Sequence, residues 1–502
     1  METQQIDSFQ TVAINPRNRN GLFFWILLLV IGAILMLIYP VMRLGYVYQI
    51  NYNEGSNVYH ASEIAEGQPL YADSSSDPFT PPAYPPLSYF LVGLSGKNFG
   101  SYLLAGRVIS LVSLLVIIFA CSLLLIHQGI NRGPAIFGGV SALLLYLDYA
   151  QDYIGMDDPH FLALLFAVTG LIIYLRKSTS WPPLMISALL MVLSLYTVQS
   201  LFALPLAIGL DVMIRSRKYG IIWVLALLLF WFLLDAFSDF HFGVQFRQQF
   251  HSLSHVAPDR VLSQLSRLDI PFFILLLTAG WTSMFCVFDT QLRVFGLYMA
   301  ISLVVAVAFS GSTISSISYF FDLFLALAFL LSVCLLKVQF AFPKSVGIRK
   351  TMLWLLPVII TFSLLYHLPI RLPRSNSTDL LASVQKGFRD DADYLKNQQG
   401  RIFCENLLLC YTAGKPLEID PYQASELAIL GETDENLILM MIETHQFSVI
   451  QLNHALPKST GTLEYSQEKD RTGSMTRNMR IAIANNYKID RRSGSGVFYS
   501  PK

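Results

Sequence analysis

Two groups of acidic residues stand out in a chain that is otherwise mostly apolar. Glu54, within Asn53-Glu54-Gly55, follows the first run of membrane-spanning length, and Asp157-Asp158-Pro159 follows a later one. A charge kept at the edge of a bilayer is costly, so these carboxylates are candidates for function. If both groups meet at one membrane face, they are suited to group transfer at the lipid–water boundary, where a carboxylate takes a proton from an acceptor hydroxyl.

The two acidic groups carry different expected roles. We expect Glu54 to be the general base, and the alternative is a solvated loop carboxylate or a charge at a helix start. We expect Asp158 to position the acceptor or to share a metal, and the alternative is an N-cap, because Asp-Pro favours a helix start. Asp157 is the weaker catalytic candidate of the pair.

Basic residues supply candidates for holding a phosphate. Arg247, Arg260 and Arg267 lie in one polar segment, and Lys97 lies in an earlier one. Cations there would stabilise a departing lipid phosphate. The alternative for each of them is a solvated surface charge.

Two charged residues fall inside or at the end of apolar segments. Arg107 lies within the second such segment and must pair or line a polar cavity, and a structural ion pair is the favoured interpretation. Asp322 is expected to line the cavity or to pair with Arg107. Histidines 241, 251 and 255 lack regular ligand spacing, so they predict no metal site. The residues define no cofactor, and a divalent metal stays an open alternative.

Composition places the chain in a membrane. Of its 502 residues, 54% are hydrophobic and 14% are charged, whereas soluble domains carry about 25% charged residues. The net charge of +1 gives no basic excess, which argues against nucleic acid as a partner. The first apolar run is too long for the core of a cleavable signal peptide, so we interpret it as a span.

About eleven segments are long and apolar enough to be helical spans. They begin near Leu22, Tyr102, Pro134, Phe161, Leu184, Leu201, Ile221, Pro271, Val294, Tyr319 and Thr351. The fold class expected is therefore an α-helical polytopic membrane protein over residues 1–366, with an α/β domain over 367–502.

The positive-inside rule predicts the orientation. With the N-terminus in the cytoplasm, the outer loops hold few basic residues, spread over long segments, whereas the short inner loops are rich in them. The inner loops then hold Arg17, Arg19, Arg132, Arg176, Lys177, Arg215, Arg217, Lys218, Arg293, Lys337, Lys344, Arg349 and Lys350. This arrangement places the loop 47–100 and the domain 367–502 on the outer side.

The polar segments have recognisable patterns of their own. Residues 54–66 predict an interfacial helix that ends at Gly67. In the C-terminal region, helices are expected at 379–399, 435–445 and 481–487, and strands at 401–409, 447–452, 487–491 and 496–499. If that region is exoplasmic, Cys404 and Cys410 are candidates for a disulfide, although their short spacing leaves the geometry open.

The order of these motifs resembles the GT-C superfamily of glycosyltransferases that use polyprenyl-phosphate sugars. The resemblance is strongest to the bacterial protein-O-mannosyltransferase-like and aminoarabinose-transferase-like branch. It spans nearly the whole chain, with Asn53 and Val198 standing where the family usually has an acid and a lysine. The residues that carry it are Asn53-Glu54-Gly55, Gly67 to Tyr71, Tyr84-Pro85-Pro86-Leu87, Gly106-Arg107, Asp158, Thr197 to Ser200, Cys404-Glu405, Ala413 to Pro416 and Asp420-Pro421.

The resemblance implies transfer of a sugar from a polyprenyl phosphate to an acceptor hydroxyl at the outer face of the bacterial inner membrane. The partners would be the lipid-linked donor, a lipid, polysaccharide or protein acceptor, and the bilayer. A lipid-linked glycan transporter or flippase is the first alternative, although transporters carry polar residues near mid-membrane. A non-catalytic glycan-assembly protein is the second, because Asn53 leaves the first motif with one acid.

Overall fold

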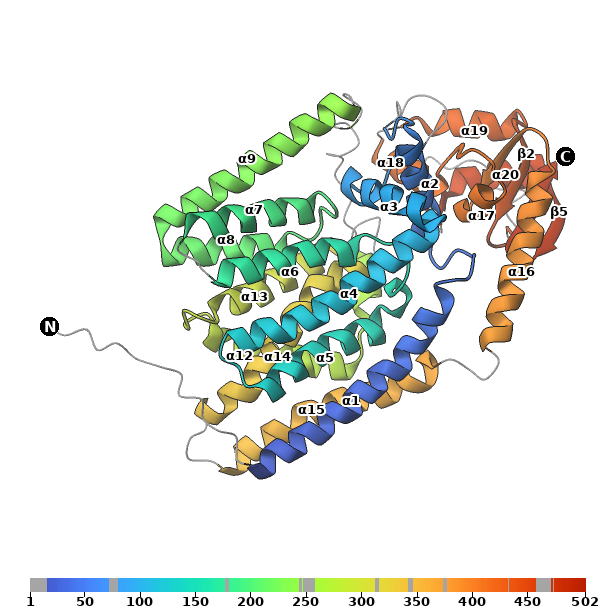
Figure 1. Cartoon of the computed structure of the whole chain (residues 1–502). Helices are drawn as coiled ribbons and strands as arrows, with labels where there is room; N and C mark the ends of the chain where they lie inside the picture. The colour runs from blue at the N-terminus through green and yellow to red at the C-terminus, as the bar shows by residue number, and fades with distance from the viewer. Residues whose placement is uncertain are drawn as a thin grey trace.

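The computed structural model describes residues 16–71, 80–176, 180–242, 246, 258–311, 316–341, 346–372, 377–431, 433–456, 471–472 and 474–502. A bundle of apolar helices forms one part of the molecule, and a smaller α/β domain forms the other (Figure 1). The α/β domain sits at one end of the bundle, together with the two helices of the first long loop, α2 and α3. The expected fold class, a polytopic helical protein with a C-terminal α/β domain, is confirmed.

A helix occupies each apolar segment that the sequence predicted. These helices are α1 (Pro16–Arg43), α4 (Tyr102–His127), α5 (Arg132–Tyr149), α6 (His160–Arg176), α7 (Trp181–Leu195), α8 (Ala203–Arg215), α9 (Arg217–Phe242), α12 (Ile270–Cys286), α13 (Arg293–Phe309), α14 (Phe321–Ala341) and α15 (Val346–Arg371). By length and composition, four described stretches are able to cross a membrane: Gly21–Arg43, Tyr102–His127, Arg217–Phe242 and Ile317–Leu336.

The bundle has a buried centre and an apolar outer surface. The stretch Ile317–Leu336, mostly α14, is predominantly apolar, with 94% of its most apolar window buried, and it packs against α5, α12 and α13. By contrast, the apolar stretch of α9 is only 17% buried, and the main contacts of this helix are with α7 and α8. An exposed apolar helix of this length is suited to face lipid.

The first long loop folds into two helices. α2 (Tyr52–Glu66) ends at Gly67, whose φ of 75° needs the left-handed region, as the sequence predicted. α3 (Pro86–Phe99) begins with Pro86 at its first position. Protein covers both faces of α2, with α3 and α4 on one side and α17 of the α/β domain on the other, and an interfacial position for this helix stays a prediction. A Cβ at Gly55 would lie 2.5 Å from the backbone nitrogen of Leu408.

The α/β domain begins with α16 (Ser377–Lys396) and builds a four-stranded sheet in the order β1-β2-β6-β5. β1 and β2 are parallel, and the remaining neighbours are antiparallel. Its elements are β1 (Arg401–Cys404), α17 (Leu407–Thr412), α18 (Pro421–Leu430), α19 (Glu435–Glu443), β2 (Phe447–Leu452), β3 (Arg471–Thr472), β4 (Met475–Thr476), α20 (Arg477–Asn486), β5 (Tyr487–Ser493) and β6 (Gly496–Pro501).

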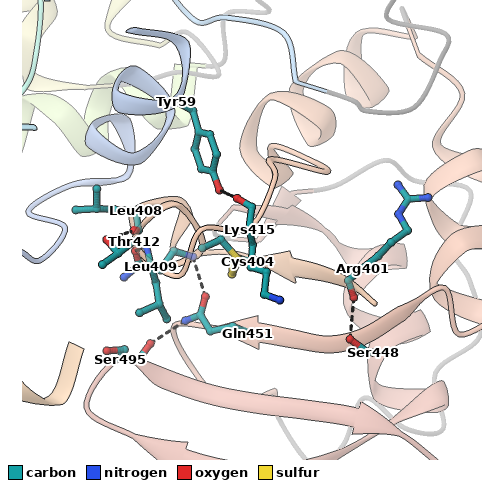
Figure 2. The surroundings of a disulfide bond; sticks show 12 residues. Tyr59, Arg401, Cys404, Leu408, Leu409, Thr412, Lys415, Ser448, Gln451 and Ser495 are labelled. Atoms are coloured by element: carbon teal, nitrogen blue, oxygen red, sulfur yellow. Dashed lines mark hydrogen bonds between the residues drawn. A yellow bond between two sulfur atoms is a disulfide. The ribbon is translucent and has the colours of Figure 1, made fainter. Parts of the chain in front are cut away.

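The structure departs from the sequence-based expectation in this domain, where β3 and β4 were not predicted and α20 begins at Arg477 rather than at residue 481. The strand expected over 401–409 ends at Cys404, because the Asn406 side chain accepts a hydrogen bond from Leu409 N and starts α17. α18 was not predicted, although Asp420 and Pro421 form a good helix start. Cys404 and Cys410 form a disulfide between β1 and α17 (Figure 2).

Candidate active site

Glu54 lies in the first turn of α2 and is fully buried, with Arg107 of α4 as its partner. Arg107 donates from Nε to Oε1 at 2.8 Å and from Nη2 to Oε2 at 2.9 Å. The backbone nitrogens of Asp157 and Ile50 donate to the same two oxygens, at 3.0 and 2.7 Å respectively. A carboxylate accepts about four hydrogen bonds. In this conformation, Glu54 therefore has no acceptor site open to a substrate.

Arg107 uses its remaining donors to organise the chain that leaves α1. Nη1 donates to the carbonyls of Arg43, Leu44 and Tyr46, and Nη2 donates to that of Tyr48 at 2.7 Å. The Arg107 guanidinium thus holds the segment between α1 and α2 in place through its backbone carbonyls. A buried charge needs such full pairing, because an unpaired one costs several kcal/mol. The structural ion pair expected for Arg107 is present, with Glu54 as its partner.

Asp157 fits against the glycine that precedes Arg107. A Cβ added at Gly106 would lie only 2.0 Å from Oδ1 of Asp157, so the carboxyl group fills the space that a side chain at position 106 would need. The side chain of Asn57 donates to the Asp157 carbonyl at 2.7 Å, which ties α2 to the same loop. Burial, with the nearby charges of Glu54 and Asp158, raises the pKa of Asp157 well above its ordinary value. This environment therefore favours the protonated form of Asp157.

Asp158 is linked to the first loop through a tyrosine. Its Oδ1 accepts from the backbone nitrogen of His160 at 3.0 Å and lies 2.6 Å from Nδ1 of the same residue. The Tyr84 hydroxyl donates to Oδ2 at 3.4 Å and accepts from Asn53 Nδ2 at 2.9 Å. Burial and the charge of Asp158 raise the pKa of Tyr84 well above its ordinary value, so this hydroxyl stays protonated. Asp158 caps α6 and also joins a chain of contacts that ends at Asn53.

A cavity of about 630 Å³ opens between this end of the bundle and the α/β domain. Its walls come from the start of α2, the end of α5 with the short helix that follows it, the segment before α12, the end of α15, and α18. The lining residues are Asn51, Tyr52, Asn53, Asp148, Tyr149, Ala150, Gln151, Asp152, Tyr153, Arg267, Ser316, Ile317, His367, Arg371 and Tyr422. Asn53 therefore faces the cavity, whereas its neighbour Glu54 faces the protein interior.

Buried Arg43 fixes the part of the wall that follows α5. Its Nη2 donates to the carbonyls of Gln151, Asp152 and Ile154. Because the Arg43 carbonyl also accepts from Arg107, the ion pair at Glu54 and the cavity wall belong to one connected framework.

The cations expected at a phosphate lie in different places. Arg267 lines the cavity, and Arg371, which the sequence did not single out, lines it too. Arg260 lies on α11 (Pro258–Leu265), where its Nη1 is buried without a partner among the described residues. Lys97 is exposed in the last turn of α3. Arg247 lies outside the described residues.

The other expected residues have clear surroundings. Asp322 accepts from the Tyr298 hydroxyl at 2.5 Å rather than pairing with Arg107. His241 packs against Phe237 and Phe242, and histidines 251 and 255 lie outside the described residues. In the part of the chain that the structure describes, no three His, Cys, Asp or Glu residues are grouped to hold a metal ion.

Comparison with known proteins identifies the fold. No family model and no curated protein sequence matches the chain. The solved structure of ArnT from Cupriavidus metallidurans in the apo state matches with a TM-score of 0.59 and 14% identity, over 96% of this chain and 98% of that one. The structure of the same protein bound to undecaprenyl phosphate matches with a TM-score of 0.55 and 14% identity, over 95% and 98%. The chain has the fold of ArnT.

The ArnT fold brings together residues that the sequence did not connect. Asp148 and Asp269 both lie close to His367, and Asp148 and His367 line the cavity, although the sequence analysis singled out none of the three. A signal was present, because Asp148 and His367 are ionisable residues near the ends of apolar helices. His160 was also missed, and its place two residues after Asp158 was the available clue.

Proposed function

We propose that this protein is a glycosyltransferase that moves a sugar from a polyprenyl phosphate to an acceptor hydroxyl in the cavity at Asn53. The observation that carries the proposal is the cavity itself, which joins the end of an apolar bundle to a polar domain and is lined by two arginines. A structure of the same fold is described as bound to undecaprenyl phosphate, which is a polyprenyl phosphate.

Arg267 and Arg371 are the residues we propose for the phosphate. Both line the cavity, and a guanidinium matches a phosphate through paired N–H donors. As the sugar leaves, negative charge accumulates on the phosphate, so fixed cations there favour bond cleavage. Lys97 is outside this arrangement, and we propose no role for it in the reaction.

The buried acids are proposed to position the reacting groups. Glu54 has all of its acceptor sites occupied, so we assign it to holding Arg107 and the start of α2 rather than to the proton transfer expected from the sequence. Asp158 orients Tyr84, and Tyr84 orients Asn53. With its nitrogen bonded to Tyr84, Asn53 keeps its amide oxygen as an acceptor, and we assign that oxygen to a substrate hydroxyl in the cavity that Asn53 lines.

We further propose that the cavity opens to the exoplasmic side of a bacterial inner membrane. The distribution of basic residues favours that orientation. The disulfide Cys404–Cys410 supports it, because such bonds persist in oxidising compartments. Nucleotide sugars are not supplied there, so the donor has to arrive through the bilayer on a lipid carrier.

The test is an assay of the purified full chain reconstituted in proteoliposomes. Undecaprenyl phosphates carrying different radiolabelled sugars are the donors, and an extract of cell-envelope lipids and polysaccharides is the acceptor. We expect one donor to lose its sugar to a product, with release of undecaprenyl phosphate. Labelled sugar that stays on the lipid with every donor would contradict the proposal, and movement of intact donor across the bilayer would favour a flippase.

Two arginine-to-glutamine variants and a matched control test the phosphate site. R267Q and R371Q should each raise the KM for the lipid donor about 10-fold or more, since hydrogen bonds to charged groups contribute about 1.5–3 kcal/mol. K97Q removes an exposed cation at the end of α3 and should leave the KM unchanged. Equal effects of the three variants would show that general surface charge, and not the cavity, binds the donor.

A further inference from the structure

His367, in the last two turns of α15, lies between two carboxylates from different helices. Its Nδ1 is 3.7 Å from Oδ1 of Asp148, and its Nε2 is 3.9 Å from Oδ2 of Asp269. Nδ1 is also 3.1 Å from the carbonyl of Ser363, one turn earlier. A proton on Nδ1 satisfies that carbonyl, so Nε2 carries the lone pair.

The two carboxylates are held so that each has one oxygen left for the imidazole. Asp148 Oδ2 accepts from the Ser363 hydroxyl at 3.0 Å, and Asp269 Oδ1 accepts from Tyr149 at 2.5 Å and from Phe272 N at 3.0 Å. Asp148 Oδ1 and Asp269 Oδ2 are buried and have no hydrogen-bond partner among the described residues. These are the two oxygens that face His367. Each ring nitrogen therefore has a carboxylate oxygen within 4 Å.

The imidazole is also placed at the proposed reaction space. His367, Asp148 and Tyr149 line the same cavity as Asn53 and Arg267. The side chain of His367 is 12% exposed, so the ring is mostly enclosed but reaches the cavity. Arg371, one turn further on, donates to the Asp148 carbonyl at 2.9 Å and is the cation that faces this group from its own helix.

The other acids near the cavity are less suited to accept a proton. Glu54 and Asp158 are engaged by hydrogen bonds from protein groups. Asp152 also lines the cavity, but its side chain is 69% exposed and lies 3.6 Å from Arg43, so it is the least enclosed acid of the cavity wall.

We propose that His367 is the general base of this enzyme, with Asp148 and Asp269 as its positioning residues. The proposal rests on the glycosyltransferase function proposed above. Nε2 takes the proton of the acceptor hydroxyl as the acceptor oxygen bonds to the anomeric carbon of the sugar. The bond between that carbon and the phosphate oxygen breaks, and its electron pair leaves on the polyprenyl phosphate. The imidazolium then returns its proton to water.

The first test replaces His367 by asparagine, whose amide keeps a donor near Ser363 and removes Nε2. We expect kcat for sugar transfer to fall by roughly 10²- to 10⁴-fold, the usual contribution of a general base. In wild type, kcat should fall at low pH as His367 becomes protonated, and this fall should be absent in H367N. H127Q changes an exposed histidine at the far end of α4 and should keep both the rate and the fall at low pH.

A second measurement separates proton transfer from a purely structural role of His367 in joining α15 to α5 and α12. Ethanol and 2,2,2-trifluoroethanol serve as small acceptors, because the fluorinated alcohol is more acidic and needs less help from a base. H367N should lose much more activity with ethanol than with trifluoroethanol. A structural defect would reduce transfer to both by the same factor, and that outcome would overturn the proposal.

The aspartates provide the same test if H367N does not fold. D148N and D269N keep the shape of each side chain and remove the ionisable group that faces the ring, so each should lower kcat about 10-fold and more strongly with ethanol than with trifluoroethanol. Wild-type transfer that survives all three substitutions would overturn the role of His367 while the proposed function stands. If the wild-type protein transfers sugar from none of the lipid donors, the proposed function fails and this role fails with it.

Discussion

The carboxyl group of Asp157, in the loop before α6, packs directly against Gly106 of α4 and leaves no room for a side chain at position 106. A Cβ at position 106 would lie 2.0 Å from Oδ1 and 2.1 Å from Cγ of Asp157. The next residue, Arg107, holds Glu54, and Glu54 accepts from the backbone nitrogen of Asp157. The pair Gly106-Arg107 therefore sets the distance between α4 and the loop that carries both acids.

A G106A substitution should disturb this contact. The added methyl must displace the Asp157 carboxyl or the loop, and overpacking of this kind costs about 1–3 kcal/mol. G280A is the matched control, because Gly280 also lies in an apolar helix and a Cβ there meets nothing within 4 Å. We expect G106A to unfold at a lower temperature and transfer sugar more slowly, and G280A to be at least as stable as wild type. Thermal unfolding in detergent checks both, and equal midpoints would contradict the prediction.

Much of the architecture was predictable because the bilayer imposes simple rules on sequence. Long apolar runs had to become helices, and Gly67 had to end α2 because of its left-handed backbone. The partner of Arg107 was not predictable. Glu54 is 53 residues away in sequence, and local pattern does not say which of several acids a buried arginine meets.

The candidate site was predictable only in part. The sequence singled out Asn53, Glu54 and Asp158. It did not reveal that Asn53 faces the cavity whereas the adjacent Glu54 faces the protein interior. That division depends on how the start of α2 packs against α17 and α4, which is tertiary information. His367 was missed for the same reason, since its two carboxylate neighbours come from distant segments.

The disulfide Cys404–Cys410 should stabilise α17, the helix of the α/β domain that packs against α2. α17 starts just after β1, and Gln49, before α2, accepts from Leu408 N at 3.1 Å. Figure 2 shows Tyr59 reaching from α2 to the carbonyl of Lys415 in the same region, and this bond is 2.5 Å long. A loop this short gives roughly 2 kcal/mol on the chain-entropy model.

We therefore expect the double variant C404A/C410A to unfold at a lower temperature and to lose part of its transfer activity. The reductant dithiothreitol should lower the unfolding temperature of wild type toward that of the double variant. The double variant is its own control, because it should not respond to reductant. A wild-type unfolding temperature that reductant leaves unchanged would contradict this prediction.

Asp420 should make the stability of the protein depend on pH. Burial raises the pKa of its carboxyl group to about 7, although the backbone nitrogens of Gln423 and Tyr422 donate to it. In the unfolded chain the pKa is about 3.9, so the folded state binds more protons between these values. Stability therefore falls as pH rises from about 4 to 7, by up to about 4 kcal/mol at 1.36 kcal/mol per pKa unit, and then stays low.

D420N should remove this pH dependence and be more stable than wild type at pH 8, since asparagine also caps helices well. D434N is the matched control, because Asp434 caps α19 from an exposed position. Unfolding temperatures from pH 4 to 9 measure both variants. If D420N follows the wild-type curve, Asp420 does not bind the extra proton.

Replacing Tyr84 tests whether Asp158 affects the reaction by orienting Asn53, the cavity residue in the first loop. The Tyr84 hydroxyl is the contact between Asn53 and Asp158, so Y84F leaves the ring packed on His160 and removes the link. We expect kcat to fall about 10-fold while the KM for the lipid donor changes little, because the hydroxyl bonds Asn53 and Asp158 rather than the arginines proposed for the phosphate. Since this hydroxyl stays protonated at working pH, the shape of the pH profile should be retained, in contrast to H367N. Steady-state kinetics from pH 5 to 9 make the comparison, and a Y84F variant with wild-type kcat would show that Asp158 serves only as the cap of α6.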